Sequence, residues 1–330
     1  MPEKCLLIGD IGGTNARFAI ANNARPGFAR ERSLRCVDFD SAELAIREYL
    51  KRARAPQPTA ICLAAAGPVV DGSVRFTNNP WRINASDLGR AFGPAPVRLL
   101  NDFEAIAYSI PFLQAGDTVQ IGLPPAADLG KADYTIGILG PGTGLGAVGL
   151  IRRDLRLFPI VGEAGHIGFA PQSQVQMDIL TALRERFDRV SVERLVSGPG
   201  LENIYWALTR IHDEDRTPLT AAEIFAAGIA NEDPRAAEAV QMFFETLGNV
   251  AGDLALLLGA ADGIYIAGGI ARRYPRELES SRFRSGFESK GRHRSLMERI
   301  PTQLVTYEQP GLLGAAYCAL QMSADPSVGF

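Results

Sequence analysis

The sequence predicts an α/β protein with mixed sheets that folds as two domains. Short apolar runs typical of strands alternate with helix-like segments along the 330 residues. Two strand–turn–strand units with glycine-rich turns, at 6–20 and 136–151, lie far apart in the chain and indicate an approximate internal duplication. A chance resemblance between two glycine-rich hairpins is the alternative. A chain of this length can bury two hydrophobic cores.

Composition excludes several classes of protein and partner. Charged residues make up 22% and apolar residues 46% of the chain, which is ordinary for a soluble globular protein. The formal net charge of -3 provides no basic field for a nucleic acid, and the apolar runs are interrupted before they reach a membrane-spanning length. The four cysteines are scattered without a CxxC pair, so we expect buried free thiols. Because no basic leader precedes the first strand, we expect a cytoplasmic protein that binds neither nucleic acid nor membrane.

The first glycine-rich turn has the composition of a phosphate site. Gly12 and Gly13 permit positive φ angles and leave no side chain between the turn and a bound group. Backbone N–H groups in such a turn form an anion-binding concavity. The carboxylate of Asp10 and the hydroxyl of Thr14 would suit the phosphates of a nucleotide and their magnesium ion. A plain hairpin with a glycine turn is the alternative.

The first half of the chain continues with strands and helices in alternation. The helix that begins near residue 42 has one apolar face, and Asp40 and Glu43 are spaced as its capping pair. The expected elements are a third strand at 31–37, this helix at 42–53, a buried strand at 59–65, a hairpin arm at 69–76, a strand at 97–100 and a helix at 102–110.

The second half of the chain is mostly helical. Thr220 and Glu223 form a capping box, and a segment that is apolar on most faces begins at Pro234 and ends at Gly259, which predicts a central buried helix. We expect the charged, irregular region 272–299 to be solvated surface. The remaining elements are the second strand–turn–strand unit at 136–151, a strand at 263–267 that ends in Gly268-Gly269, a strand at 303–307 and a last helix at 310–320.

Asp102 is the sharpest single candidate for chemistry. It lies where a strand ends and a helix begins, the position that α/β architectures use for groups that face a ligand. A carboxylate there could accept the proton of a substrate hydroxyl as that hydroxyl attacks phosphorus. The alternative, equally favoured by the residues alone, is that Asn101 and Asp102 only cap the helix.

Two further acidic groups accompany a histidine in the middle of the chain. Glu163 and His166 lie three residues apart in a glycine-rich stretch that reads as a loop, so a zinc site is not expected and hydrogen bonding to sugar hydroxyls suits them better. A histidine satisfied within the fold is the alternative. Glu193 precedes a helix with proline in its first turn, and by itself it reads as a carboxylate favoured by the helix dipole.

Several short motifs together carry a family resemblance. They occur in the order Gly-Asp-Ile-Gly-Gly-Thr-Asn-Ala-Arg, Leu-Asn-Asp-Phe, Gly-Thr-Gly-Leu-Gly, Gly-Glu-Ala-Gly-His, Ser-Gly-Pro-Gly-Leu, Ile-Ala-Gly-Gly-Ile and Pro-Gly-Leu-Leu-Gly. Along nearly its whole length the chain resembles the bacterial glucokinases. The resemblance implies an ATP-dependent glucose 6-phosphotransferase with Mg²⁺ as its metal, glucose as its substrate and a homodimeric state.

The resemblance also implies a fold and a domain division. The expected fold is the two-lobed, actin-like (ribonuclease-H-like) one with a central inter-lobe cleft. The small lobe would comprise residues 1–112 plus 304–330, with the C-terminal helix returning to it, and the large lobe residues 113–303.

Carried over residue by residue, the resemblance assigns roles to positions of this chain. Asp102 would be the catalytic base and would contact the sugar, and Asp10 would lie near Mg²⁺, through water. Sugar-binding residues would be Asn78, Asn101, Glu163, His166 and Glu193. The ATP-binding residues would be Gly9, Asp10, Ile11, Gly12, Gly13, Thr14, Gly142, Thr143, Gly144, Gly268 and Gly269.

Some features separate this chain from relatives and competitors. Ala164 replaces the commoner glycine of the Gly-Gly-His pattern, a change that affects only local loop geometry. The related repressor–kinase family carries a cysteine-rich zinc segment after its histidine, whereas Phe169-Ala170-Pro171 follows here. Kinases for another hexose or an amino sugar are the main alternative. A sugar-responsive regulator lacks support because no DNA-reading module is evident, and an actin-like assembly ATPase would not need the sugar-binding residues.

Overall fold

The computed structural model describes residues 4–76, 79–93 and 95–324. They form two compact units, one of residues up to Gln114 together with those from Tyr307 onward, the other of Ala115–Thr306. The sequence-based division has its boundaries at 112/113 and 303/304, close to these. Each unit is described separately below.

The first unit is built on a five-stranded sheet in the order β3-β2-β1-β4-β7. The strand β1 pairs antiparallel with β2 and parallel with β4, and β4 pairs parallel with β7. Parallel neighbours bring their carboxyl ends to one edge of the sheet. The strands are β1 (Leu6–Ile11), β2 (Asn15–Ala21), β3 (Phe28–Arg35), β4 (Ala60–Ala65) and β7 (Val97–Asn101), and a separate hairpin comprises β5 (Ser73–Arg75) and β6 (Arg82–Asn84).

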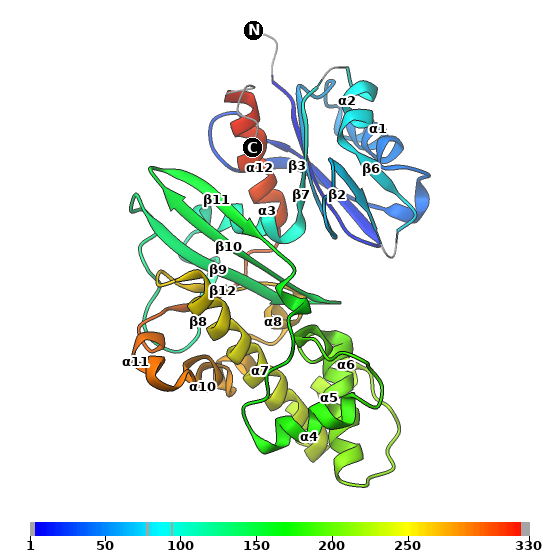
Figure 1. Ribbon diagram of the computed structural model, residues 1–330. Coiled ribbons are helices and arrows are strands. Elements are labelled where there is room, and N and C mark those ends of the chain that lie inside the picture. Colours follow the sequence, from blue (N-terminus) through cyan, green and yellow to red (C-terminus); the bar gives the residue numbers. More distant parts are fainter. Residues whose placement is uncertain (1–3, 77–78, 94, 325–330) are drawn as a thin grey trace. The chain divides into compact units, whose positions relative to one another are not determined.

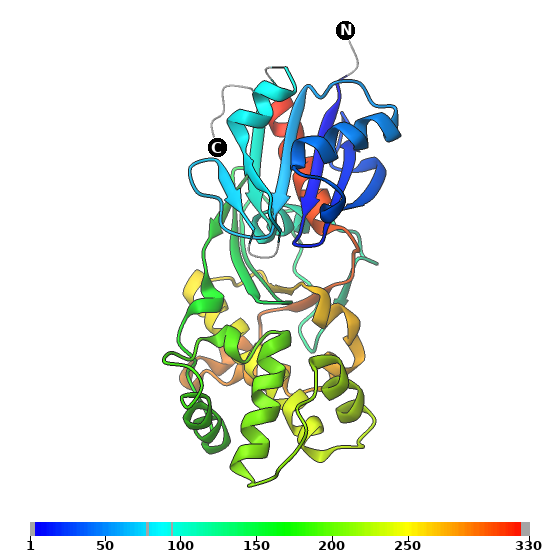
Figure 2. The ribbon, with the colours of Figure 1, turned by 90° about the vertical axis from the view of Figure 1, so that its right-hand side faces the viewer.

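Helices cover both faces of this sheet. Figure 2 shows α1 in front of the strands and the red α12 behind them, and Figure 1 shows α3 beside α12. The helix α12 packs on α3, β1 and β4. The elements are α1 (Ala42–Ala53), α2 (Ala85–Ala91), α3 (Asp102–Ser109) and α12 (Pro310–Ala324), with single 3₁₀ turns η1 (Cys36–Asp38) and η2 (Ile110–Phe112).

The second unit contains a six-stranded sheet in the order β11-β10-β9-β12-β13-β8. Like β1, β9 pairs antiparallel with the strand that follows it and parallel with a strand that comes later in the chain. This repeated pairing pattern supports the predicted duplication. The strands are β8 (Thr118–Gln120), β9 (Tyr134–Pro141), β10 (Leu145–Arg153), β11 (Arg156–Val161), β12 (Ile264–Ile266) and β13 (Thr302–Val305).

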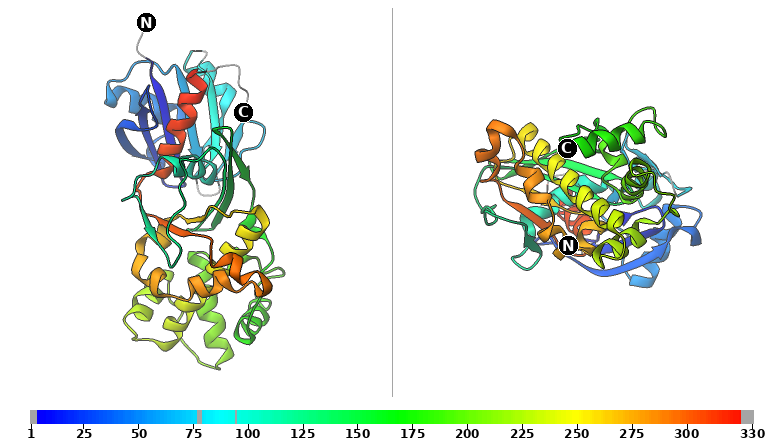
Figure 3. Two further views of the ribbon diagram at one scale, coloured as in Figure 1. Left: turned by 90° about the vertical axis from the view of Figure 1, so that its left-hand side faces the viewer. Right: turned by 90° about the horizontal axis from the view of Figure 1, so that it is seen from below.

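The long helix α7 organises the rest of the second unit. It spans Pro234–Leu258, with Asp233 as its N-cap and Gly259 in the left-handed conformation at its C-cap, so the predicted central helix is confirmed. It is the long yellow helix that runs diagonally across the right panel of Figure 3. The predicted capping box at α6 is also confirmed. The other elements are η3 (Ala164–His166), α4 (Gln174–Leu183), η4 (Val192–Arg194), α5 (Gly198–Ile211), α6 (Ala221–Ile229), α8 (Gly269–Arg273), α9 (Pro275–Ser280), α10 (Phe283–Glu288), η5 (Gly291–His293) and α11 (Arg294–Met297).

The prediction of solvated surface for region 272–299 is wrong. Four short helices occupy it, and the side chains of Phe283 and Phe287 are fully buried. These two residues lie four apart on α10, which packs against α7. The many arginines and glutamates of the region cover its outer side. The charged composition therefore did not predict that the region contributes side chains to the core.

Smaller predictions are corrected or confirmed. The N-cap of α1 is Ser41, whose hydroxyl accepts from the backbone N–H of Leu44, rather than Asp40. The third strand begins and ends two or three residues earlier than expected, the predicted hairpin arm at 69–76 is a strand only at Ser73–Arg75, and the last helix continues to Ala324. All four cysteines are buried and none forms a disulfide, as predicted. Within the described ranges, no helix is long and apolar enough to cross a membrane.

Candidate functional site

The carboxyl edge of the first sheet brings two predicted groups together. Ile11, Ala65 and Asn101 are register neighbours on β1, β4 and β7. Each strand ends at or next to this row, so the turn after β1 and the first residue of α3 leave the sheet at the same edge. Ligands of α/β sheets bind at such edges.

The turn after β1 is held by backbone contacts to its surroundings. The N–H of Gly12 donates to the carbonyl of Asn15 at 2.9 Å, and the carbonyl of Thr14 accepts from the N–H of Cys36 at 2.8 Å. The side-chain amide of Asn79 donates to the carbonyl of Gly12 at 3.3 Å. The residue Asn79 is buried and was not predicted as part of the site.

The expected positive φ angles at Gly12 and Gly13 are absent, so that part of the argument is wrong. A methyl group on Gly12 would come no closer than 3.7 Å to the carbonyl oxygen of Asn15, an ordinary contact. The fold therefore does not demand glycine there, and the lack of a side chain leaves room for a bound group. Gly9 differs, because a methyl there would lie 2.8 Å from a methyl carbon of Leu63, so core packing accounts for it.

Asp10 lies in this strand and is half-buried. Burial raises the pKa of Asp10, and the charge of Arg17, its register neighbour on β2, opposes that rise. The carboxylate of Asp10 and the hydroxyl of Thr14, in the turn that follows, offer oxygen donors only. This donor set fits Mg²⁺, which is commonly held by one or two carboxylates together with substrate phosphates and water.

Asp102 is the first residue of α3, and its neighbour Asn101 is the cap. The side-chain oxygen of Asn101 accepts from the N–H of Phe103 at 2.9 Å and of Glu104 at 3.4 Å, and its amide donates to the carbonyl of Gly67 at 3.1 Å. The capping role therefore belongs to Asn101. One carboxylate oxygen of Asp102 accepts from the same Phe103 N–H at 2.9 Å.

A partly buried ion pair fixes α3 on the sheet. Arg98 of β7 donates to the carboxylate of Glu104 at 3.0 Å and to the hydroxyl of Tyr108 at 3.2 Å. Burial raises the pKa of Glu104, and the guanidinium of Arg98 opposes this rise. Because these contacts join the first two turns of α3 to β7, they hold the helix that begins with Asp102.

The second unit repeats this arrangement with a turn between β9 and β10. The N–H of Gly142 donates to the carbonyl of Gly144 at 2.8 Å, and the carbonyl of Gly142 accepts from the N–H of Gly198, the first residue of α5, at 2.8 Å. Nothing lies within 4 Å of a methyl built on Gly142, and Thr143 is exposed. The turn is therefore held by a backbone hydrogen bond to α5, and the space around Gly142 is open.

The segment after β12 lies against the end of β9. A methyl on Gly140 would lie 2.3 Å from the carbonyl oxygen of Ala267, and one on Gly268 would lie 2.6 Å from that of Pro141. The φ angle of Gly268 is +91°, so glycine is required there for conformation as well as space. Gly269 has open space around it and begins α8. The structure thus brings Gly268 and Gly269 to the edge that carries the Gly142 turn.

Glu193 is joined directly to that turn. Its carboxylate accepts from the N–H of Leu145 at 2.9 Å, and a methyl on Gly144 would lie 2.5 Å from the same oxygen, Oε2. The hydroxyl of Ser197 donates to the backbone carbonyl of Glu193 at 2.8 Å, which fixes the residue from the side of α5. The turn and the Glu193 carboxylate therefore form one rigid piece.

The loop that carries Glu163 and His166 packs beside this piece. Its middle residue, Gly165, is buried, and a methyl there would lie 2.3 Å from the carbonyl oxygen of Leu145. The carbonyl of Ile167 accepts from the N–H of Val192, the residue before Glu193, at 2.9 Å. Glu163 and His166 themselves are exposed. The expected loop contains a single 3₁₀ turn, and the fold gathers the three predicted sugar-binding groups of this unit around one backbone network.

For two residues that were predicted to bind ligands, the structure provides no contact of this kind. Asn78 lies outside the described residues. Ile11 is buried in β1, where its side chain belongs to the core of the first unit.

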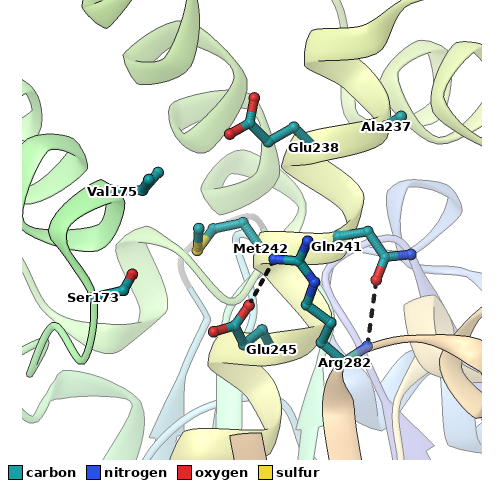
Figure 4. A pocket seen from close by; sticks show the side chains of 8 residues that line it. All are labelled: Ser173, Val175, Ala237, Glu238, Gln241, Met242, Glu245 and Arg282. Carbon is teal, nitrogen blue, oxygen red and sulfur yellow. Dashed lines mark hydrogen bonds and ion pairs between the residues drawn. The ribbon is translucent and has the colours of Figure 1, made fainter. Parts of the chain in front are cut away.

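A pocket of about 500 Å³ in the second unit shares no residue with these candidates. Figure 4 shows it between Ser173 and Val175 on one side and α7 on the other. Arg282, below it, pairs with Glu245 at 3.3 Å and bonds to Gln241 through its backbone N–H, also at 3.3 Å. The remaining charged group of the lining, Glu238, pairs with Arg235 at 2.8 Å, and we assign the pocket no ligand.

Comparison with known proteins identifies what the chain resembles. The family model described as Glucokinase matches residues 7–322. The glucokinase of Caulobacter sp. strain K31 is 43% identical over 312 residues, which cover 94% of this chain and 93% of that protein. The crystal structure of a glucokinase from an Antarctic psychrotroph superposes with a TM-score of 0.87 at 34% identity, covering 96% of this chain and 98% of that one. A ROK family glucokinase from Streptomyces griseus, solved with glucose and AMPPNP, shares the fold with a TM-score of 0.62 at 21% identity, covering 96% of this chain and 99% of that one.

Proposed function

The chain belongs to the glucokinase family, enzymes of actin-like fold that phosphorylate glucose, and we propose how its residues carry out this reaction with ATP. The acceptor would be the 6-hydroxyl of glucose and the donor the γ-phosphate of ATP. The observation that carries the proposal is the position of Asp102, an acid at the start of α3 at the same edge of the sheet as the turn that follows β1.

Asp102 would act as the general base. Its carboxylate accepts the proton of the 6-hydroxyl as that oxygen attacks the γ-phosphorus in line with the departing ADP oxygen. The cap formed by Asn101 and the Arg98–Glu104 pair hold α3, so the carboxylate is oriented before the sugar binds. Orientation of this kind lowers the entropic part of the barrier.

The two glycine turns would bind the nucleotide. Backbone N–H groups around Gly12–Thr14 and Gly142–Gly144 would contact the phosphates, and Gly268-Gly269 the adenosine part. Asp10 would hold Mg²⁺, through water, and the ion when bound would neutralise charge on the phosphates. The AMPPNP bound by the Streptomyces griseus enzyme supports ATP as donor.

Glucose would be held by residues that both donate and accept hydrogen bonds. Glu163, His166 and Glu193 would bind ring hydroxyls. The side-chain oxygen of Asn101 caps α3 and one of its amide hydrogens is donated to Gly67, so its second amide hydrogen would be donated to the sugar. The glucose in the Streptomyces griseus structure supports this substrate. A site built to hydrogen-bond the ring hydroxyls rejects sugars that lack one of them.

The direct test is a coupled assay of ADP release over a panel of sugars. We expect ADP release that depends on glucose and is lower by a large factor, on the order of 10², with hexoses or amino sugars that differ at one ring hydroxyl. Equal or higher kcat/KM with another hexose or an amino sugar would identify a kinase for that sugar instead. ADP release without sugar, accompanied by sedimenting polymer, would point to an assembly ATPase.

Replacing Gly144 with Ala is expected to weaken glucose and ATP together. The added methyl displaces the Glu193 oxygen that holds Leu145, so both the sugar-binding carboxylate and the phosphate turn move. We expect the KM values for both substrates to rise by about tenfold or more, the effect of losing one hydrogen bond to a charged group. Steady-state kinetics with each substrate varied in turn measure this.

The matched control is Gly116→Ala, because nothing lies within 4 Å of a methyl built there. Its kinetics should equal those of the wild type. A Gly144→Ala enzyme in which only one of the two KM values changes would show that Glu193 does not connect the two substrates.

A further inference from the structure

The C-terminal helix α12 packs on β1, and its Gly311 lies next to the carboxylate of Asp10. A methyl built on Gly311, the second residue of the helix, would lie 3.2 Å from the carboxyl carbon and 3.2 Å from Oδ2 of Asp10. At this separation a side chain at position 311 would press on the carboxylate, whereas glycine leaves it room. The positive end of the α12 dipole favours a negative charge at this position.

One turn further along, the same helix touches α3. A methyl on Gly314 would lie 1.7 Å from the carbonyl oxygen of Ala105, which no side-chain adjustment relieves. Ala105 is in the first turn of α3, three residues after Asp102. At the next turn Tyr317 packs its ring against Tyr108 of α3, with the ring centroids 5.5 Å apart. Residues 311, 314 and 317 thus share one face of α12.

This face connects the two acidic groups of the first unit. The strand register fixes where β1 and β7 end, yet it does not fix the Asp10 side chain or the axis of α3. Gly311 borders the space that the Asp10 side chain occupies. Gly314 sets how closely the axis of α3 approaches α12. A helix is stiff over one turn, so both constraints come from a single rigid body.

We propose that Gly311 is a positioning residue: with Gly314, it makes α12 a spacer that sets the Asp10 carboxylate relative to α3 and Asp102, and so tunes the binding of the magnesium nucleotide. The inference rests on the proposed function for the roles of Asp10 and Asp102. Position 311 acts through Asp10, because the Asp10 carboxylate is the group that a side chain there would meet.

The alternative is that glycine at 311 only permits close packing of α12 on the sheet. The two explanations differ in what Gly311→Ala does. Alanine favours helix over glycine, so its effect on the helix itself is stabilising. A pure packing defect would lower stability and leave substrate affinities unchanged, whereas displacement of Asp10 lowers nucleotide affinity in a protein of nearly unchanged stability.

The experiment measures Gly311→Ala by calorimetric binding of Mg-AMPPNP and by kinetics. We expect the dissociation constant of Mg-AMPPNP and the KM for ATP to rise by roughly three- to tenfold, with the KM for glucose and the thermal unfolding midpoint within error of the wild type. The control Gly116→Ala should change none of these values. Unchanged nucleotide binding in folded Gly311→Ala would overturn the proposal.

A double-mutant cycle with Asp10→Asn tests whether Gly311 acts through Asp10. In the Asp10→Asn background, Gly311→Ala should alter Mg-AMPPNP binding by less than about twofold, because the displaced charge is already gone. An equal effect in both backgrounds would contradict the proposed route. Calorimetric binding needs no turnover, so a failure of the glucose assay and a failure of this inference remain distinguishable.

Should Gly311→Ala not fold, Pro310→Ala replaces it. This change adds no bulk and removes the ring that preorganises the first turn of α12. We expect weaker Mg-AMPPNP binding, by about twofold or more, with unchanged glucose binding. Wild-type nucleotide binding in Pro310→Ala would then overturn the proposal.

Discussion

Replacing Asp102 with Asn is expected to lower kcat for glucose phosphorylation by roughly 10²- to 10⁴-fold, the contribution of a positioned general base. The amide has the shape of the carboxylate but cannot take the proton of the attacking hydroxyl. Since Asn101 provides the cap and the Arg98–Glu104 pair holds the helix, α3 should form unchanged. The KM for ATP and the binding of glucose should therefore stay near their wild-type values.

Rapid-quench measurement of a single turnover checks the chemical step, and calorimetry checks glucose binding. The control Asp213→Asn makes the same chemical change at an exposed loop position with a positive φ angle, which Asn tolerates well, and should retain full activity. Full turnover by the Asp102→Asn enzyme would remove Asp102 from the mechanism. Loss of activity through loss of glucose binding alone would make Asp102 a sugar-binding residue.

Replacing Gly248 with Ala is expected to cost roughly 3 kcal/mol of the free energy of unfolding or more. The added methyl would lie 2.0 Å from the carbonyl oxygen of Phe283 and 3.0 Å from the backbone nitrogen of Phe287. Both are backbone atoms, so α7 and α10 must separate to make room. Separation unpacks two fully buried phenylalanines from the core of the second unit.

Urea unfolding followed by circular dichroism measures the loss as a lower midpoint. The control on the same helix is Leu257→Ala, because Leu257 is 81% exposed and its truncation should change stability by less than about 0.5 kcal/mol. A Gly248→Ala protein as stable as the wild type would mean that α10 does not need the close backbone approach to α7.

Local signals were sufficient for much of the fold. Pro234 and Gly259 bound α7 correctly because helix ends depend on nearby residues: Asp233 caps the first turn, and glycine adopts the left-handed angle at the last. The capping box of α6 was identified for the same reason. The junction of β7 and α3 was likewise readable, which placed Asp102 at an edge of the sheet.

Contacts between distant residues were not readable. Phe283 and Phe287 lie in a region whose charged composition predicted solvent, and only packing against α7 shows that they are core. The same applies to glycines. The sequence could not separate Gly12, which has an ordinary φ angle, from Gly268, whose φ angle is +91°, because backbone conformation depends on what lies beside the turn.

By itself, therefore, the sequence determined the elements, their caps and the acidic residues at strand ends, since these follow from interactions within a few residues. Only the tertiary structure shows which backbone segment lies next to each acidic side chain. The carboxylate of Glu193 accepts from the N–H of Leu145, 48 positions away, and the carboxylate of Asp10 lies next to Gly311 of the last helix. Such contacts arise from the packing of whole helices on sheets, which fixes distances to tenths of an ångström and leaves no local pattern in the chain.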